Sequence, residues 1–322
     1  MLFRRSGALA TLAVLAALAL AGCGSGSAPA PPPPAAPHGN PPIKVVTSTN
    51  VYGSIARAVG GDQVDVTSLI NDPQADPHSY ETTPGDAAKV ATANVILYNG
   101  GGYDDFMERL VQSSGGKAVS IDVTALSGLD PTAGAGGADA ASNPYFNEHL
   151  WYSLPTVQKV ADQLATDFGA ADPADADLFT TNAQAFKDKV ANLLTKEQAI
   201  GAAHPGARVA VTEPVPGYLI QSAGLTDVTP PEFARAIEED TDPPAAVLQQ
   251  TLALFTNNPV SALILNAQTE TPTTTQVEQA AQAAKIPVVM VTETLPAGVD
   301  DYITWMNSEI EALANALNGS PQ

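Results

Sequence analysis

Two histidines and two glutamates are the side chains of this sequence whose types and surroundings best suit a metal ion. His78 lies in the run DPHSYE, and His149 lies in the run NEHLW. Glu213 and Glu293 each follow a short apolar run that ends in threonine, VAVT and VVMVT. Imidazole nitrogens and carboxylate oxygens are ligands that divalent transition metals accept. If folding brings these four side chains together, they can fill a four-coordinate metal site.

Each of these residues alone also fits an ordinary structural role. A glutamate at the end of a strand is often simply exposed to solvent, and a lone histidine in a loop is usually solvated. The matched placement of Glu213 and Glu293 favours a shared site, because ligands in open α/β sheets bind at the carboxyl ends of strands. We therefore expect both carboxylates to point into one crevice, which the loops carrying His78 and His149 can reach.

Other segments are weaker candidates for chemistry. His204, in a His-Pro-Gly run, is expected to lie in a turn. The three glycines at 100–102 lack the lysine and serine or threonine of a phosphate-binding loop, so they predict a tight turn. Glu81 either begins a helix or accepts a hydrogen bond from an imidazole N–H, and Trp151 is expected to pack rather than bind.

The elements that would position these residues alternate between strands and helices. Short runs rich in β-branched residues predict strands, and periodic segments between them predict helices. The expected strands are residues 43–48, 64–70, 95–98, 118–123, 207–212, 262–265 and 287–292. The longest periodic segment, within 173–203, predicts one long amphipathic helix. The predicted fold class is α/β, with two Rossmann-like lobes of parallel strands joined by this helix and a metal site in the cleft between them.

The first residues have the pattern of a secretory signal. A positive segment at Arg4 and Arg5 precedes an uncharged apolar run over 8–21, which is shorter than the roughly 20 residues that span a bilayer. The run ends in LAGC, which resembles the lipobox of bacterial lipoproteins. Cys23 is the only cysteine among the 322 residues, so it cannot form an internal disulfide. We expect Cys23 to be lipidated; the alternative is an ordinary signal peptide that ends near a cysteine.

Composition sets the expected domain organisation. Residues 23–42 are rich in Pro, Ala and Gly, which predicts a flexible spacer after the lipidated cysteine. The expected spans are a signal peptide (1–22), this lipidated spacer (23–42), an N-terminal α/β lobe (43–172), a linking helix (173–203) and a C-terminal α/β lobe (204–322). The formal net charge is −20, which argues against nucleic acid or an anionic membrane surface as a partner.

Several of these segments together resemble a known family. The stretch DPHSYETTPGDAAKVATANVILYNGG is similar to the signature of metal-binding lipoproteins that serve ATP-binding-cassette (ABC) importers of zinc and manganese. The resemblance continues through EHLWYSLP, the long helix, TEPVPGYLIQSAGL and VTETLP. It therefore covers the chain from Ile43 to Leu317.

The resemblance implies four metal ligands. His78 and His149 stand at the two histidines of the family pattern. Glu213 stands where zinc-type members often have histidine and manganese-type members often have glutamate. Glu293 stands where most members have aspartate, so this chain departs from the pattern by one methylene. It also lacks the His-rich loop of many zinc-type members, having TAGAGGADAAS instead.

The function that the resemblance implies is capture of a divalent transition metal, Zn(II) or Mn(II), with Fe(II) as a third candidate, for delivery to an ABC permease. We expect a monomeric, extracytoplasmic protein that is not an enzyme and is held at the cell membrane by its lipid anchor. One alternative is an extracytoplasmic metallohydrolase, although the sequence has neither an H-E-x-x-H helix nor a G-x-S-x-G elbow. The other is a surface adhesin lipoprotein of the same fold.

Overall fold

A computed structural model describes residues 40–319 of the protein, apart from residues 74, 76 and 131–145. The predicted signal peptide, Cys23 and the TAGAGGADAAS stretch lie outside the described residues. Within the part that is described, no helix combines the length and the apolar character that crossing a membrane requires.

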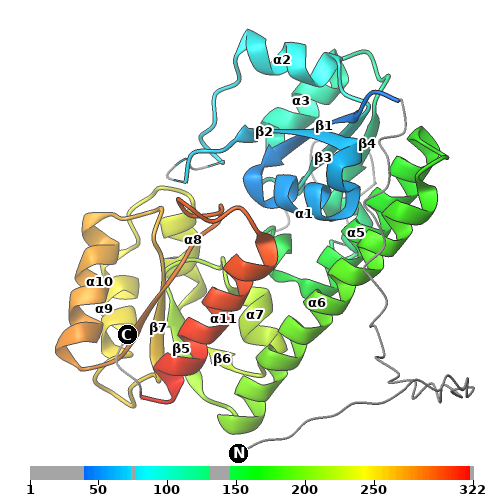
Figure 1. Ribbon diagram of the computed structural model, residues 1–322. Helices are drawn as coiled ribbons and strands as arrows, with labels where there is room; N and C mark the ends of the chain where they lie inside the picture. Colours follow the sequence, from blue (N-terminus) through cyan, green and yellow to red (C-terminus); the bar gives the residue numbers. More distant parts are fainter. Residues whose placement is uncertain (1–39, 74, 76, 131–145, 320–322) are drawn as a thin grey trace, which may run out of the picture. The chain divides into compact units, whose positions relative to one another are not determined.

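The first lobe contains a four-stranded parallel sheet with the strand order β2-β1-β3-β4 (Figure 1). Its strands are β1 (Ile43–Thr49), β2 (Val64–Ile70), β3 (Val95–Tyr98) and β4 (Val119–Asp122). Its helical segments are α1 (Asn50–Gly60), η1 (Gly61–Gln63), α2 (Pro84–Ala91), α3 (Asp105–Ser113), α4 (Val123–Ser127), η3 (Leu150–Tyr152) and α5 (Leu154–Ala171).

The second lobe repeats this plan with the strand order β6-β5-β7-β8, again all parallel. Its strands are β5 (Arg208–Val211), β6 (Thr226–Asp227), β7 (Ala262–Asn266) and β8 (Val288–Val291). Its helices are α7 (Gly217–Ser222), α8 (Pro231–Glu238), α9 (Ala245–Ala253), α10 (Pro272–Ala283) and α11 (Tyr302–Leu317). Neither β6 nor α8 was expected from the sequence, because each is too short to show a clear hydrophobic period.

Burial accounts for the apolar character of the strands. All four residues of β3 and all five residues of β7 are buried, because helices cover both faces of each parallel sheet. Helix α2 begins with a capping box between Thr83 and Asp86, and Pro84 occupies its first turn. This cap fixes the chain a few residues after His78.

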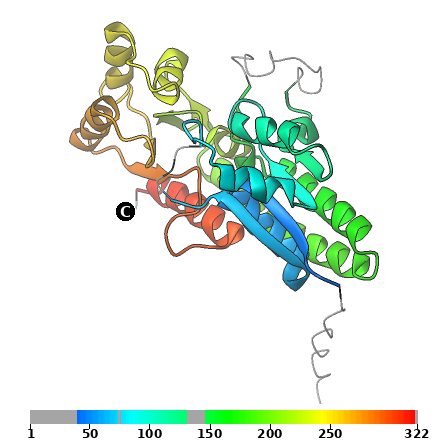
Figure 2. The same ribbon diagram turned by 90° about the horizontal axis from the view of Figure 1, so that it is seen from above.

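The long helix α6 (Ala176–Ala203) packs against elements of both lobes. Its 28 residues correspond to a length of about 42 Å at the usual rise per residue. It contacts α1 and α5 on one side of the molecule and α7 and α11 on the other, and both views show it beside α5 (Figures 1 and 2). One hydrophobic cluster accordingly contains Trp151 and Phe186 together with Val211 and Trp305.

Hydrogen bonds also join the two lobes directly. The side-chain amide of Asn50, at the start of α1, donates to the carbonyl of Leu295 (3.2 Å) and accepts from the backbone N–H of Leu295 (2.9 Å). The hydroxyl of Tyr152 donates to the carbonyl of Thr292 at 3.0 Å. These bonds hold the segment after β8, which carries Glu293, against the first lobe.

Candidate metal site

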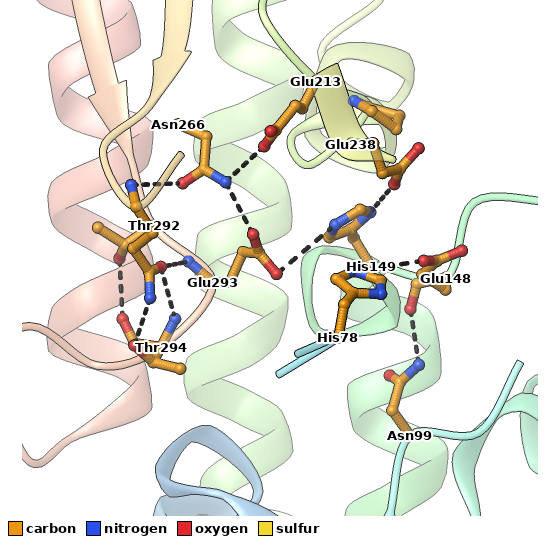
Figure 3. A network of polar contacts seen from close by, with 12 residues as sticks. His78, Asn99, Glu148, His149, Glu213, Glu238, Asn266, Thr292, Glu293 and Thr294 are labelled. Atoms are coloured by element: carbon orange, nitrogen blue, oxygen red, sulfur yellow. Dashed lines mark hydrogen bonds and ion pairs between the residues drawn. The ribbon is translucent and has the colours of Figure 1, made fainter. Parts of the chain in front are cut away.

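The two glutamates predicted as ligands follow the ends of two strands of the second sheet, β5 and β8. Glu213 lies two residues after β5, and Glu293 lies two residues after β8. Strand β7 lies between β5 and β8, and its last residue is Asn266. The strand-end rule therefore brings both carboxylates to one edge of the sheet, with the Asn266 amide between them (Figure 3).

The side chain of Asn266 contacts both carboxylates. Its Nδ2 donates to Oε2 of Glu213 at 2.5 Å and to Oε1 of Glu293 at 2.7 Å. Glu213 and Glu293 are each 3% exposed, and Asn266 is 1% exposed. Because water has little access to these carboxylates, the amide donor that they share contributes strongly to holding them.

His149 faces this edge from the first lobe and is 1% exposed. Its Nδ1 lies 2.8 Å from Oδ1 of Asn147, whose Nδ2 donates to the carbonyl of Pro214 at 2.8 Å. The Pro214 carbonyl fixes the orientation of the Asn147 amide, so Oδ1 accepts and Nδ1 of His149 carries the proton. The unprotonated Nε2 lies 3.9 Å from Oε2 of Glu293. A backbone-anchored partner that fixes the tautomer in this way is typical of metal-binding histidines.

Burial lowers the pKa of His149 well below its ordinary value of 6.5, and the nearby His78 lowers it further. The imidazole is therefore neutral at pH 7. A neutral ring with a lone pair on Nε2 is the form that binds a metal ion.

His78 approaches from the loop before α2, and its side chain is 28% exposed. Its ring lies edge-on to Tyr103, with 5.2 Å between ring centroids. One potential ligand atom each from His78, His149 and Glu293 lies within 4.8 Å of the others. Among the described residues, Glu213 is not a member of this group of three. It is linked to Glu293 by the Asn266 amide, which donates a hydrogen bond to each carboxylate.

Two further glutamates line the site, and sequence reasoning had not assigned either to it. Glu238, the last residue of α8, lies 3.9 Å from Nδ1 of His149, and Glu148 lies 3.6 Å from Nε2 of His78. His78, Glu148 and Glu238 form a second group whose potential ligand atoms lie within 4.8 Å of one another. Glu238 belongs to an IEED run with no recognisable motif, so only the fold places it here.

The concentration of carboxylates alters their ionisation. Burial, together with the negative charges of Glu148, Glu213 and Glu293, raises the pKa of Glu238 to about 9. Burial is also the main cause that raises the pKa of Glu148, to about 7. These buried carboxylates repel one another when ionised. A cation bound among them would stabilise their ionised forms.

The glycine run at 100–102 forms the predicted tight turn. All three glycines have positive φ (72°, 68° and 104°), and a Cβ on Gly100 would lie 2.5 Å from Oδ1 of Asp122. The preceding residue, Asn99, donates to the carbonyl of Glu148 at 2.8 Å. The turn therefore supports the backbone next to His149. Trp151 is fully buried and packs against Tyr103 and His149, as expected for a packing residue.

Comparison with known protein families assigns the chain. The family model described as zinc-uptake complex component A, periplasmic, matches residues 45–316. The chain belongs to this family. Its members are solute-binding proteins rather than enzymes. This family assignment argues against the metallohydrolase alternative.

Curated relatives carry the names of different metals. The manganese-binding lipoprotein MntA of Bacillus subtilis is 32% identical over 146 residues, which are 45% of this chain and 46% of that protein. The protein of the same name from Halalkalibacterium halodurans is 24% identical over 225 residues, 65% and 72% of the two chains. The iron-binding protein YfeA of Yersinia pestis is 31% identical over 150 residues, 46% and 45% of the two chains. The matches therefore span about half the length of the Bacillus and Yersinia proteins.

Solved structures confirm the predicted fold class. The periplasmic zinc-binding protein TroA of Treponema pallidum has a TM-score of 0.69 at 19% identity, covering 86% of this chain and 99% of that one. FpvC of Pseudomonas aeruginosa, solved in complex with Mn2+, has a TM-score of 0.67 at 22% identity, covering 87% and 100%. At these identities the likeness concerns the fold: two parallel-sheet α/β lobes and a long helix.

Proposed function

We propose that the protein captures a divalent transition metal outside the cytoplasm and delivers it to an ABC importer. His78, His149, Glu213 and Glu293 are the proposed ligands. The observation that carries the proposal is the group formed by His78, His149 and Glu293, whose potential ligand atoms come from both lobes and lie within 4.8 Å of one another. The relatives named for manganese, iron and zinc support it.

The chemistry of the donor set suits capture rather than catalysis. Two imidazole nitrogens and two carboxylate oxygens can complete a four-coordinate shell, whereas a catalytic zinc site keeps one position for water or substrate. The candidate ions are Zn(II) and Mn(II), followed by Fe(II). Their affinities for a given nitrogen and oxygen site rise in the order Mn(II), Fe(II), Zn(II).

The location proposed for the protein rests on its first residues. Removal of residues 1–22 and lipidation of Cys23 would anchor the chain at the outer surface of the cell membrane, with residues 24–42 as a spacer. The names of MntA and of the MtsA proteins of Streptococcus pyogenes, which are called lipoproteins, support this arrangement. The proposed partner is the permease of an ABC importer, and the protein would act as a monomer.

Metal binding can be tested on the purified mature domain. The protein is stripped with a chelator, dialysed and titrated with Zn(II) and with Mn(II) against a chelating indicator, and the bound metal is counted by elemental analysis. We expect one ion per chain, and we expect His149→Ala to lose most of the affinity.

His204→Ala is the matched histidine control. His204 follows the end of α6 and lies 3.1 Å from Oδ1 of Asn318, so its loss should leave binding unchanged. Wild-type protein that binds neither ion, or equal losses in the two variants, would contradict the proposal.

A further inference from the structure

A buried amide occupies the place between the two carboxylates proposed as ligands. The orientation of Asn266 is fixed by its neighbours: its Oδ1 accepts the backbone N–H of Gln268 at 3.1 Å, and its own backbone N–H donates to Oγ1 of Thr212 at 3.0 Å. The NH2 end of the amide must therefore face the carboxylates. Its two N–H groups match the two acceptors, Oε2 of Glu213 and Oε1 of Glu293.

The backbone that carries Glu293 is fixed from the same strand end. Oε1 of Gln268 accepts the N–H of Glu293 at 2.5 Å, and Nε2 of Gln268 donates to Oγ1 of Thr294 at 3.0 Å. The same Nε2 lies 3.3 Å from the carbonyl of Ala75, in the loop that leads to His78. Gln268 thus holds the Glu293 backbone while Asn266 holds its carboxylate, and the side chain has little freedom to turn.

We propose that Asn266 is a positioning residue that sets the metal specificity of the site. By engaging one oxygen of Glu213 and one oxygen of Glu293, it directs each carboxylate to bind the ion through its other oxygen only. This inference rests on the proposed function, because it concerns how the proposed ligands meet the ion.

The mode of carboxylate binding decides the number of donors. Two histidines and two monodentate carboxylates supply four donors, the number that Zn(II) accepts in tetrahedral protein sites. If both carboxylates bound through two oxygens each, the same four residues would supply six donors, which suits the octahedral preference of Mn(II). The Asn266 amide therefore favours Zn(II) over Mn(II), although both ions can use the same ligands.

The test compares the relative affinity of the two ions, which a merely structural role of Asn266 would not change. In Asn266→Leu both amide donors are lost, and in Asn266→Ser one hydroxyl donor remains. The ratio of the Zn(II) to the Mn(II) association constant is measured by competition titration. Co(II) bound in place of Zn(II) gives a second readout, because its visible absorption is intense in four-coordinate sites and weak at higher coordination.

We expect Asn266→Leu to lower the Zn(II)/Mn(II) ratio about tenfold, because losing a residue that supports a metal ligand typically lowers metal affinity about 10–100-fold, and Mn(II) can regain donors from carboxylates that bind through two oxygens. Its Co(II) absorption should weaken, and Asn266→Ser should lie between Asn266→Leu and the wild type. Asn182→Ala is the control, because it removes an amide that donates to the carbonyl of Val59 at 3.1 Å, outside the site.

An unchanged ratio and an unchanged Co(II) spectrum in Asn266→Leu, with both affinities lowered equally, would overturn the inference and leave the proposed function standing. If Asn266→Leu does not fold, the same two measurements on Asn266→Ser decide the question. Wild-type protein that binds no metal would overturn the proposed function itself, which separates the two failures.

Discussion

Replacing Asn147 by alanine should weaken metal binding without removing any proposed ligand. The Asn147 side chain accepts from Nδ1 and from the backbone N–H of His149 at 2.8 and 3.0 Å, and it donates to the carbonyl of Pro214 at 2.8 Å. Alanine removes all three bonds. The proton of His149 is then no longer held on Nδ1. The tautomer that carries the proton on Nε2 becomes more populated, and in that form Nε2 has no lone pair for the ion.

The size of the effect follows from these bonds. Losing a partner that orients a metal-binding histidine typically lowers metal affinity about 10–100-fold, which corresponds to about 1.4–2.8 kcal/mol. Each neutral hydrogen bond contributes about 0.5–1.5 kcal/mol to stability. Because Asn147 is only partly buried and water can replace some of its contacts, we expect the metal-free protein to lose about 1–3 kcal/mol in total.

The assay measures affinity by competition titration and stability by urea unfolding of the metal-free protein. Gly217→Ala perturbs the same residue independently, because a Cβ at Gly217 would lie 2.5 Å from Nδ2 of Asn147 and would displace that side chain. We expect affinity to fall in both variants, with the smaller loss in Gly217→Ala. Asn147→Ala protein that is less stable but binds metal as tightly as the wild type would refute the claim that Asn147 orients His149.

Three further predictions concern different parts of the chain. His78→Ala should remove most of the rise in melting temperature that added Zn(II) produces, since an ion stabilises the fold only by binding it; an undiminished rise would exclude His78 as a ligand. Burial raises the pKa of Glu309 from 4.5 to about 8, opposed by hydrogen bonds from Tyr152 and Trp305. The folded state therefore binds this proton more tightly than the unfolded state, and stability is lost as pH rises through that window. The difference in unfolding free energy between Glu309→Gln and the wild type should therefore change in favour of the variant from pH 5 to pH 8. Urea unfolding measured across this range checks it, and a difference that stays constant with pH would contradict it. Cys23→Ala should move the protein from the membrane fraction to the medium or periplasm on cell fractionation, whereas an unchanged membrane fraction would rule out an anchor at Cys23.

The sequence was sufficient to predict the fold class, because strand and helix periods alternate clearly along the chain. The long helix was also visible from its spacing, since apolar residues recur every three or four positions over nearly thirty residues, a period that strands do not have. The expected strand at 118–123 corresponds to β4 (Val119–Asp122), with small differences at its ends. Such ends depend on hydrogen bonds to neighbouring strands, which the sequence pattern does not specify.

The surroundings of the candidate site were harder to predict. Strand-end logic indicated that Glu213 and Glu293 would point to one edge, but only the strand order places β7 and Asn266 between them. Asn266 itself ends the run ALILN and looks like an ordinary strand terminus. Glu238 reaches His149 from a short helix that sequence reasoning missed, so no local pattern marked it.

The cluster that includes residues from both lobes has a consequence for how the molecule unfolds. Tyr302 of α11 packs on Phe186 of α6, with 6.0 Å between ring centroids, and its hydroxyl donates to the carbonyl of Trp151 at 2.7 Å. Neither half of the chain can complete its apolar interior without the other. Heating should therefore unfold the whole domain in one cooperative transition. Either half expressed separately would expose apolar aromatic side chains and aggregate.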